Sequence, residues 1–421
     1  MISPAIALFF IPNNRQQRKT FFILLATITG SILVFGGAED GVRHFAKVKE
    51  LYVGLPFSEF LALAGKILTL QNAAPANDDI YIHIISYIAG GILNFPQFFW
   101  SIVSFVYSYF YISAAFKIYY WYRIKNKSIF FLYFFALFLA FKSFEGINTV
   151  RTWTGLWVLF YGIISYYQRP KFKYLLLILA PPLIHIGYLA LAVPVWATML
   201  INTQNVTVKI SIIAIFFVSF FVTIEQLGIL ERASQTEVGA SKVENYHVEE
   251  AGSRPLLKLD QLGNTNFYKA IHRSYLNYFF VLCIAVIMIG YGNYFSKFNA
   301  IESKLFSIGL ASQAFSNVTS FLFAVSNRSA EIAVVFICAS LVLYFQRTYF
   351  DNGHNELAFT QRKLVQLFSI LLSTIFLYKI AAMIQWLNVF TFGLPFLAFL
   401  FEDLNITVRD FLAPIIKPLF S

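Results

Sequence analysis

Apolar runs of about 20 residues recur along almost the whole chain, and each is long enough to cross the roughly 30 Å hydrocarbon core of a bilayer as a helix. Hydrophobic residues make up 58% of the 421 positions and charged residues only 13%, which excludes a soluble globule. We therefore predict an all-α polytopic transmembrane helical bundle of about twelve spans, with residues 1–421 forming a single membrane domain. The predicted helices are 20–37, 97–121, 128–146, 152–167, 174–200 (counted as two), 208–227, 274–293, 303–325, 330–346, 364–384 and 386–401.

Lys and Arg residues gather in short clusters between the apolar runs, which is the positive-inside pattern of membrane proteins. This distribution argues against a nucleic-acid partner despite the net charge of +11, because the cations do not follow one face. Placing the clusters in the cytoplasm puts both termini on that side of the membrane. The clusters are Arg15, Arg18 and Lys19; Arg123, Lys125 and Lys127; Arg169, Lys171 and Lys173; and Arg347, Arg362 and Lys363.

Two stretches then fall on the outer side, namely residues 38–96 and a large polar loop at 228–272. Within the first stretch, the apolar segments 58–70 and 80–94 are short for a span, so we predict interfacial or re-entrant helices there. The alternative is that 80–94 crosses the membrane, which would place the next basic cluster outside and break the charge rule.

A double proline, Pro181 and Pro182, interrupts the apolar run 174–200. Proline removes a backbone donor and disfavours helix at the preceding residue, so we predict two short helices with His185 near the outer break. An imidazole in this place can act as a general base or donate a hydrogen bond to a phosphate. The alternative is a packed histidine that bonds to a freed carbonyl group.

Three arginines, Arg43, Arg151 and Arg328, are expected on the outer side, against the positive-inside bias. Asn148 lies on the same side, close to Arg151 in sequence. Any single arginine at the end of an apolar run can be an interfacial anchor. Three together suggest an anionic ligand, because the guanidinium fork suits phosphate and carboxylate oxygens. We therefore expect a lipid-linked anion as the substrate.

Acidic residues on the outer side offer a second choice of base. Asp40 and Glu39 can take this role or cap a loop, and Asp78 and Asp79 are predicted to cap the helix that starts at residue 80. The sequence has no Gly-rich phosphate loop, H-E-x-x-H motif or Cys/His cluster, so no metal or cofactor is predicted. The two cysteines lie in apolar helices and are predicted to be packing residues: Cys283 and Cys338.

Residues 146–196 read GINTVRTWTGLWVLFYGIISYYQRPKFKYLLLILAPPLIHIGYLALAVPVW. This order of an N-x-x-R element at a helix start, an apolar span, a basic turn and an apolar run reaching a histidine resembles the EpsG-like group of Wzy-type bacterial polysaccharide polymerases. Asn148, Arg151 and His185 fall on the pattern. Asp40, Arg328 and the SKVENY segment ending at Tyr246 are weaker echoes. The sequence departs from the family at Thr152, where a glutamine is usual, and lacks the usual tyrosine after Asp40.

The resemblance implies a membrane glycosyltransferase that joins polyprenyl-pyrophosphate-linked oligosaccharide repeat units at the outer face of the bacterial inner membrane, making O-antigen, capsule or exopolysaccharide. It implies that Arg151 and Arg328 stabilise the departing pyrophosphate, with His185 or Asp40 as the base. Arg43, Asn148 and Tyr246 would help to bind the substrate, and membrane lipids and a chain-length regulator would be partners. The alternatives are an O-antigen ligase, a lipid-linked glycan flippase or transporter, and a structural membrane scaffold.

Overall fold

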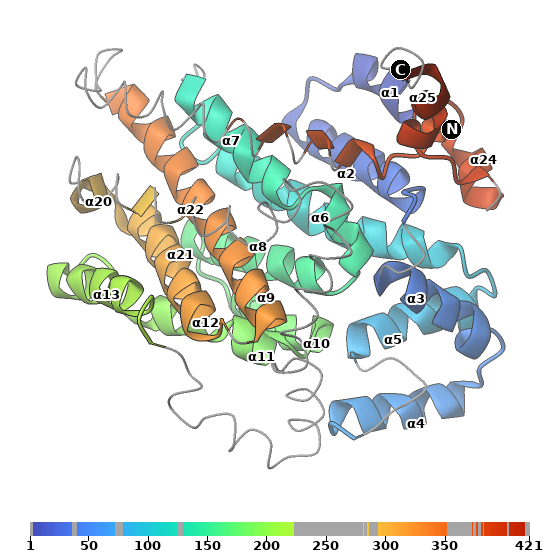
Figure 1. Ribbon diagram of the computed structural model, residues 1–421, viewed down its shortest axis with the longest axis horizontal. Coiled ribbons are helices and arrows are strands. Elements are labelled where there is room, and N and C mark those ends of the chain that lie inside the picture. Colours follow the sequence, from blue (N-terminus) through green and yellow to red (C-terminus); the bar gives the residue numbers. More distant parts are fainter. Residues whose placement is uncertain are drawn as a thin grey trace. The chain divides into compact units, whose positions relative to one another are not determined.

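The computed structural model describes residues 3–35, 40–71, 79–123, 129–222, 281, 284–285, 294–320, 322–351, 373, 376–377, 380–381, 383–401 and 404–416 (Figure 1). These residues are helical apart from their turns and one antiparallel bridge between Asn388 and Thr407, which confirms the predicted all-α fold class. Three helices in this part of the chain are long and apolar enough to cross a membrane: Phe98–Tyr119, Phe131–Thr149 and Ala324–Thr348. The full count of about twelve spans stays a prediction, and the predicted outer loop 228–272 lies outside the described residues.

The chain forms two compact units. Unit 1 comprises Met1–Tyr119, Lys142–Ile186 and Tyr378–Ser421, and unit 2 comprises Tyr120–Phe141 and Gly187–Leu377.

The centre of unit 1 is helix α8 (Thr152–Gln168), which is apolar on nearly all faces and therefore almost wholly buried. It packs between α6 (Phe98–Tyr119) and α9 (Phe172–Leu179). Helix α9 approaches closely at Gly162, where a Cβ atom would lie 3.1 Å from the backbone nitrogen of Ile178. Helix α2 (Arg15–Ser31) also packs against α6.

The apolar run after α8 is broken at the double proline, as predicted. The prediction of two short helices is wrong, however, because the run forms four: α9, α10 (Pro181–Ile184), α11 (Tyr188–Leu191) and α12 (Val193–Leu200). Helices α9 and α12 have eight residues each, so each rises only about 12 Å and neither can cross a bilayer alone. The chain passes from unit 1 to unit 2 just after His185 and Ile186.

Short helices also form at the two predicted interfacial segments: α4 (Phe57–Leu68) and α5 (Ile80–Ser86), which continues as η3 (Tyr87–Ile92). The Phe60 ring stacks on His83, with centroids 4.6 Å apart, and holds α4 against α5. His83 donates from Nε2 to the Phe60 carbonyl and accepts at Nδ1 from Tyr52, so it is a structural residue. The apolar side chains of α4 that stay exposed suit an interfacial position; they are Phe57, Leu61 and Leu68.

Unit 2 is built on a helical hairpin of α21 (Ala300–Val318) and α22 (Phe323–Asp351), which lie side by side in Figure 1. The two backbones come close at Gly309, where a Cβ atom would lie 3.0 Å from the Ala333 carbonyl oxygen. Helix α7 (Ile129–Phe141) covers α22, while α12 and α13 (Val206–Val218) cover α21. The buried Cys338 packs within α22, as predicted, and Cys283 lies outside the described residues.

Several predicted helix boundaries are wrong. The helices predicted at 20–37 and 208–227 end already at Ser31 and Val218. The helix predicted at 303–325 ends at Val318, and residues from Phe323 onward begin α22 instead, because the chain reverses between them through backbone turn bonds. The helix predicted at 386–401 is replaced by the bridge at Asn388, a short 3-10 turn, and the six-residue α24 (Pro395–Leu400). Pro395 has no backbone donor and can only open a helix. Most of the helix predicted at 364–384 lies outside the described residues.

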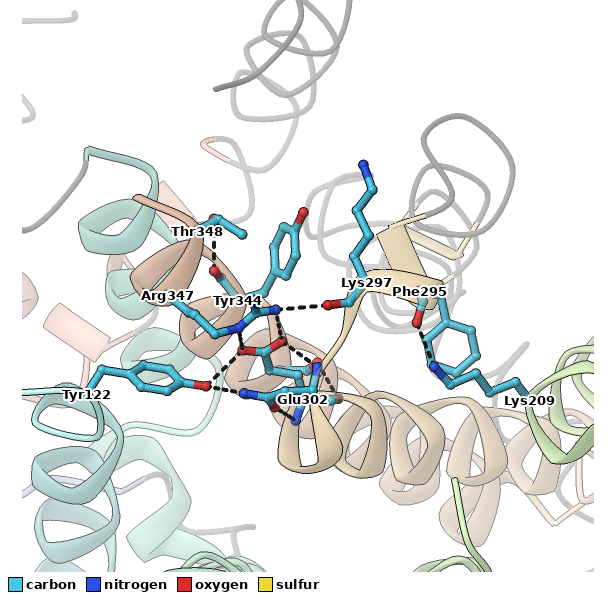
Figure 2. A network of polar contacts seen from close by, with 10 residues as sticks. Tyr122, Lys209, Phe295, Lys297, Glu302, Tyr344, Arg347 and Thr348 are labelled. Atoms are coloured by element: carbon cyan, nitrogen blue, oxygen red, sulfur yellow. Dashed lines mark hydrogen bonds and ion pairs between the residues drawn. The ribbon is translucent and has the colours of Figure 1, made fainter. Parts of the chain in front are cut away.

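A buried ion pair joins the two helices of the hairpin (Figure 2). The Arg347 guanidinium donates from Nε and Nη2 to the two carboxylate oxygens of Glu302, at 2.9 and 2.7 Å. The Tyr122 hydroxyl donates to the same carboxylate at 2.9 Å, and Asn299 completes a capping box with Glu302 at the start of α21. Arg347, predicted only as a cytoplasmic anchor, therefore also has a structural role.

Replacing Glu302 with Gln should lower the free energy of unfolding of the purified protein by about 3 kcal/mol, because Arg347 would lose its buried counter-charge. Glutamine can also occupy this position of a capping box, so the substitution removes the negative charge and keeps the helix cap. Thermal unfolding in detergent measures the effect, with Glu59→Gln on exposed α4 as the matched control. Equal melting temperatures for the two variants would contradict a structural role for the pair.

Candidate functional site

The carboxylate of Asp79 connects three segments of unit 1. Its Oδ2 atom accepts a hydrogen bond from Nη1 of Arg151 and lies 3.2 Å from Nδ1 of His185. Its Oδ1 atom accepts from the backbone N–H of Ile186 at 2.7 Å. The Asp79 side chain is only 1% exposed and that of His185 6%, whereas the Arg151 side chain is 21% exposed. A buried carboxylate thus holds a histidine and a partly accessible arginine together.

The predicted capping role of Asp79 is wrong. Asp79 does occupy the N-cap position of α5, but its side chain makes no hydrogen bond to the helix. Its oxygens instead accept hydrogen bonds from the Arg151 guanidinium and from the backbone N–H of Ile186, which follows the proline break. Charge-assisted hydrogen bonds of this kind are stronger than a neutral helix cap. Asp78 lies outside the described residues. The position of Asp79 directly before an apolar helix, on the predicted outer side, is as compatible with a site residue as with a cap.

The surroundings of Asp79 keep it ionised. Burial alone would raise the pKa of this carboxyl group, but the hydrogen bond from His185, the charges of Arg151 and His185 and the bond from Ile186 outweigh burial. The pKa is therefore held well below its usual range. An ionised Asp79 can only accept hydrogen bonds, so Nδ1 of His185 must carry a proton and donate it. In the neutral ring of His185, Nε2 then carries the lone pair.

A strained turn positions Arg151. Val150 has φ +55° and ψ −52°, a region that a β-branched residue rarely adopts. The Arg151 N–H donates to the Thr149 carbonyl, so Val150 is the central residue of a γ-turn between η4 (Phe144–Thr149) and α8. The Thr154 hydroxyl donates to the Val150 carbonyl at 2.6 Å and holds the turn from the other side. Arg151 becomes the N-cap residue of α8, at the helix start where the sequence placed it.

The segments that carry two further predicted residues, Asp40 and Asn148, pack against each other. Helix α3 (Asp40–Lys47) packs on η4 at Gly41, where a Cβ atom would lie 2.7 Å from the Asn148 carbonyl oxygen. Asp40 pairs with Arg43, whose side chain is 69% exposed. Burial acts to raise the pKa of Asp40, but the hydrogen bond from Arg43 and the positive charges of Arg43, Arg151 and His44 lower it below the ordinary value. Asp40 is therefore a weak base.

The structure thus brings five predicted site residues into unit 1 together with Asp79; they are Asp40, Arg43, Asn148, Arg151 and His185. Arg328 belongs to unit 2, on α22, where it and Glu331 act electrostatically on the buried Tyr188 hydroxyl. Tyr246 and Glu39 lie outside the described residues.

Within the described ranges, no group of three or more His, Cys, Asp or Glu residues could hold a metal ion. Comparison with protein-family models, curated proteins and solved structures finds no match for this chain.

Proposed function

We propose that this chain is a membrane glycosyltransferase that joins polyprenyl-pyrophosphate-linked oligosaccharide repeat units into a surface polysaccharide at the outer face of the bacterial inner membrane. The observation that carries the proposal is the contact of Arg151 and His185 with one buried carboxylate, Asp79. This arrangement places a candidate base next to a cation that can hold an anionic leaving group.

The reaction is the attack of an acceptor sugar hydroxyl on the anomeric carbon of a second lipid-linked chain. The new glycosidic bond forms as the bond to the lipid pyrophosphate breaks, and the hydroxyl proton passes to Nε2 of His185. Asp79 stabilises the imidazolium that results, because it is ionised and bonded to Nδ1. His185 is favoured over Asp40 as the base, since the pKa of Asp40 is lowered by its cationic neighbours.

Arg151 is suited to stabilise the leaving group, the lipid pyrophosphate. A guanidinium has five N–H donors, and the contact with Asp79 uses one at Nη1. Negative charge grows on the pyrophosphate as its bond breaks, so a donor placed in advance stabilises the transition state more than the ground state. Arg43, which is largely exposed, and Asn148 are proposed to bind more distant parts of the substrate. Arg328 and Tyr246 are also proposed to bind the substrate.

The proposed orientation follows from the two ends of α8. Arg151 opens this helix and Arg169 follows it, and the 17 residues between them rise about 25 Å, close to the thickness of a bilayer core. Arg169 belongs to a basic cluster expected in the cytoplasm. Arg151 is then expected at the outer surface, where lipid-linked repeat units are polymerised.

Deleting the gene should leave surface glycan as single repeat units on its final acceptor, because synthesis and export of the unit remain intact. Gel electrophoresis of the surface glycan measures the chain-length distribution. Restoring the gene with His185→Asn should give the same single-unit pattern. Restoring it with His83→Asn, a buried histidine of unit 1 bonded to Tyr52 and Phe60, should give polymer at matched protein level.

The alternatives predict different patterns. Loss of every surface repeat unit would favour a flippase, and loss of the whole glycan from its lipid acceptor would favour a ligase. A normal ladder of chain lengths would contradict all three functions.

A further inference from the structure

A basic pocket of about 500 Å³ lies in unit 1, where the start of α2 and the end of α6 meet Tyr161 of α8. Three of its lining residues are cations, Arg15 and Lys19 from α2 and Lys117 from the last turn of α6. The rest of the lining is polar or aromatic and consists of Asn14, Gln16, Ser113, Phe116 and Tyr161. The proposed catalytic residues do not line this pocket.

The cations of the pocket repel one another. The charges of Lys19, Arg169 and Arg15 all act on the Lys117 ammonium. Burial and the neighbouring Arg15 hold the pKa of Lys19 below its ordinary value. Among the described residues, neither Lys19 nor Lys117 has a carboxylate partner. Such an assembly of like charges is destabilising by itself and would be relieved by an anion.

The remaining contacts of the two lysines place their ammonium groups without neutralising them. Lys117 donates to the side-chain oxygen of Gln168 at 2.7 Å and lies over the Tyr161 ring, 5.5 Å from its centroid. Lys19 lies over the Tyr109 ring at 5.7 Å. Aromatic rings and a neutral amide hold a cation in place but leave its charge available to a ligand.

The position of the pocket indicates which anion it takes. Lys117 ends a helix that is apolar and long enough to cross a membrane, so the pocket lies where that helix would meet the lipid headgroups. Basic pockets between membrane helices at this level recognise phosphate-bearing headgroups.

We propose that this pocket binds a phosphate-bearing anion, the headgroup of an anionic phospholipid or a soluble phosphate, between Lys19, Lys117 and Arg15. The site does not depend on the proposed catalytic function. It lies at the opposite end of α8 from Arg151, and bound anion would stabilise unit 1 by screening the repulsion among its cations.

The test uses the purified full-length protein in neutral detergent. Thermal unfolding is followed after addition of phosphatidylglycerol, phosphatidylcholine, glycerol phosphate or inorganic phosphate, and native mass spectrometry counts bound lipid. Phosphatidylglycerol should raise the melting temperature of the wild-type protein and phosphatidylcholine should not. The double variant Lys19→Gln/Lys117→Gln should bind phosphatidylglycerol roughly 10- to 30-fold more weakly, since each lysine contributes about a factor of five.

Two further variants keep the result interpretable. Lys171→Gln/Lys173→Gln removes the same charge from exposed positions outside the pocket and should bind like the wild type. Lys19→Arg/Lys117→Arg retains the charge and should retain binding. Without anion, the melting temperature of the Gln double variant should be no lower than that of the wild type, because the repulsion between the lysine ammonium groups has been removed.

The outcomes separate the two sources of the anion. Stabilisation by phosphatidylglycerol alone assigns a lipid headgroup, and equal stabilisation by glycerol phosphate or inorganic phosphate assigns a soluble anion. Wild-type protein that responds to none of the three phosphate compounds more than to phosphatidylcholine would overturn the proposal. Unchanged lipid binding by the Gln double variant would do the same.

Discussion

Asp79→Asn should abolish polymer formation while leaving a protein that still inserts into the membrane. Asparagine keeps the size of the side chain and can still accept from the Ile186 N–H, but it cannot stabilise a positively charged His185 or balance Arg151. The loss in polymerisation rate should be about 1000-fold or more, since the carboxylate both orients the base and stabilises its protonated form. Chain-length analysis of the surface glycan at matched protein level measures the effect.

Asp410→Asn provides the control, because Asp410 is an exposed carboxylate of unit 1 on α25 (Val408–Ile416). It should leave the glycan ladder unchanged. A full ladder from Asp79→Asn would contradict both the positioning role of Asp79 and the proton transfer to His185.

The difference in stability between the wild type and Asp79→Asn should depend on pH. The folded-state pKa of Asp79 is depressed, so its ion pairs contribute stability that is complete above about pH 5 and is lost as the pH falls below about 4. Asp79→Asn lacks this contribution, so the stability difference from the wild type should shrink on acidification. A difference that stays constant from neutral to acidic pH would show that the carboxylate is not ionised in the folded protein.

Arg151→Lys should lose much of the polymerase activity and Arg151→Ala nearly all of it. Lysine keeps a positive charge beside Asp79 but not the planar fork of donors that can hold two pyrophosphate oxygens. A buried charge-assisted contact of this kind is worth about 2 to 4 kcal/mol, which corresponds to roughly a 30-fold to nearly 1000-fold change in rate. The readout is again the chain-length distribution of the glycan at equal membrane abundance.

The Arg151→Lys variant also distinguishes two roles of Arg151, which are to neutralise Asp79 and to hold the leaving group. If Arg151 served only to neutralise Asp79, Arg151→Lys would make full-length polymer and Arg151→Ala would fail through low abundance. Arg409→Lys on the exposed surface of α25 is the matched control and should behave like the wild type. Full polymer from Arg151→Lys would contradict the leaving-group role of Arg151.

Local signals in the sequence were sufficient for several features of unit 1. The proline pair fixed the break after α9, because proline removes backbone donors whatever surrounds it. The start of α8 at Arg151 and the short helices α4 and α5 followed from where apolar runs begin and end. The packing of α3, which begins at Asp40, on the segment of Asn148 was expected only in the sense that both residues were assigned to one side of the membrane.

The parts that were not predicted depend on long-range partners. Asp79 meets Arg151 across 72 residues and Glu302 meets Arg347 across 45, and no periodicity in the sequence encodes either pairing. Asp79 was predicted only as a helix cap, since capping preferences are local and such pairings are not. The wrong prediction of a continuous helix at 386–401 has a similar origin. It followed from the apolar composition alone, whereas Pro395 and the bridge from Asn388 to Thr407 determine the structure there.

The bond between Asp79 and the Ile186 N–H also bears on how the chain is assembled during synthesis. Its acceptor is made 107 residues before its donor, and ribosomes deliver the chain from the N-terminus. When the proline-broken segment emerges, an exposed backbone donor in apolar surroundings would be costly, and the carboxylate that satisfies it already exists. The acceptor, Asp79, is therefore synthesised before the Ile186 N–H that needs it. The hydrogen bond between them can form before any later part of the polypeptide is made.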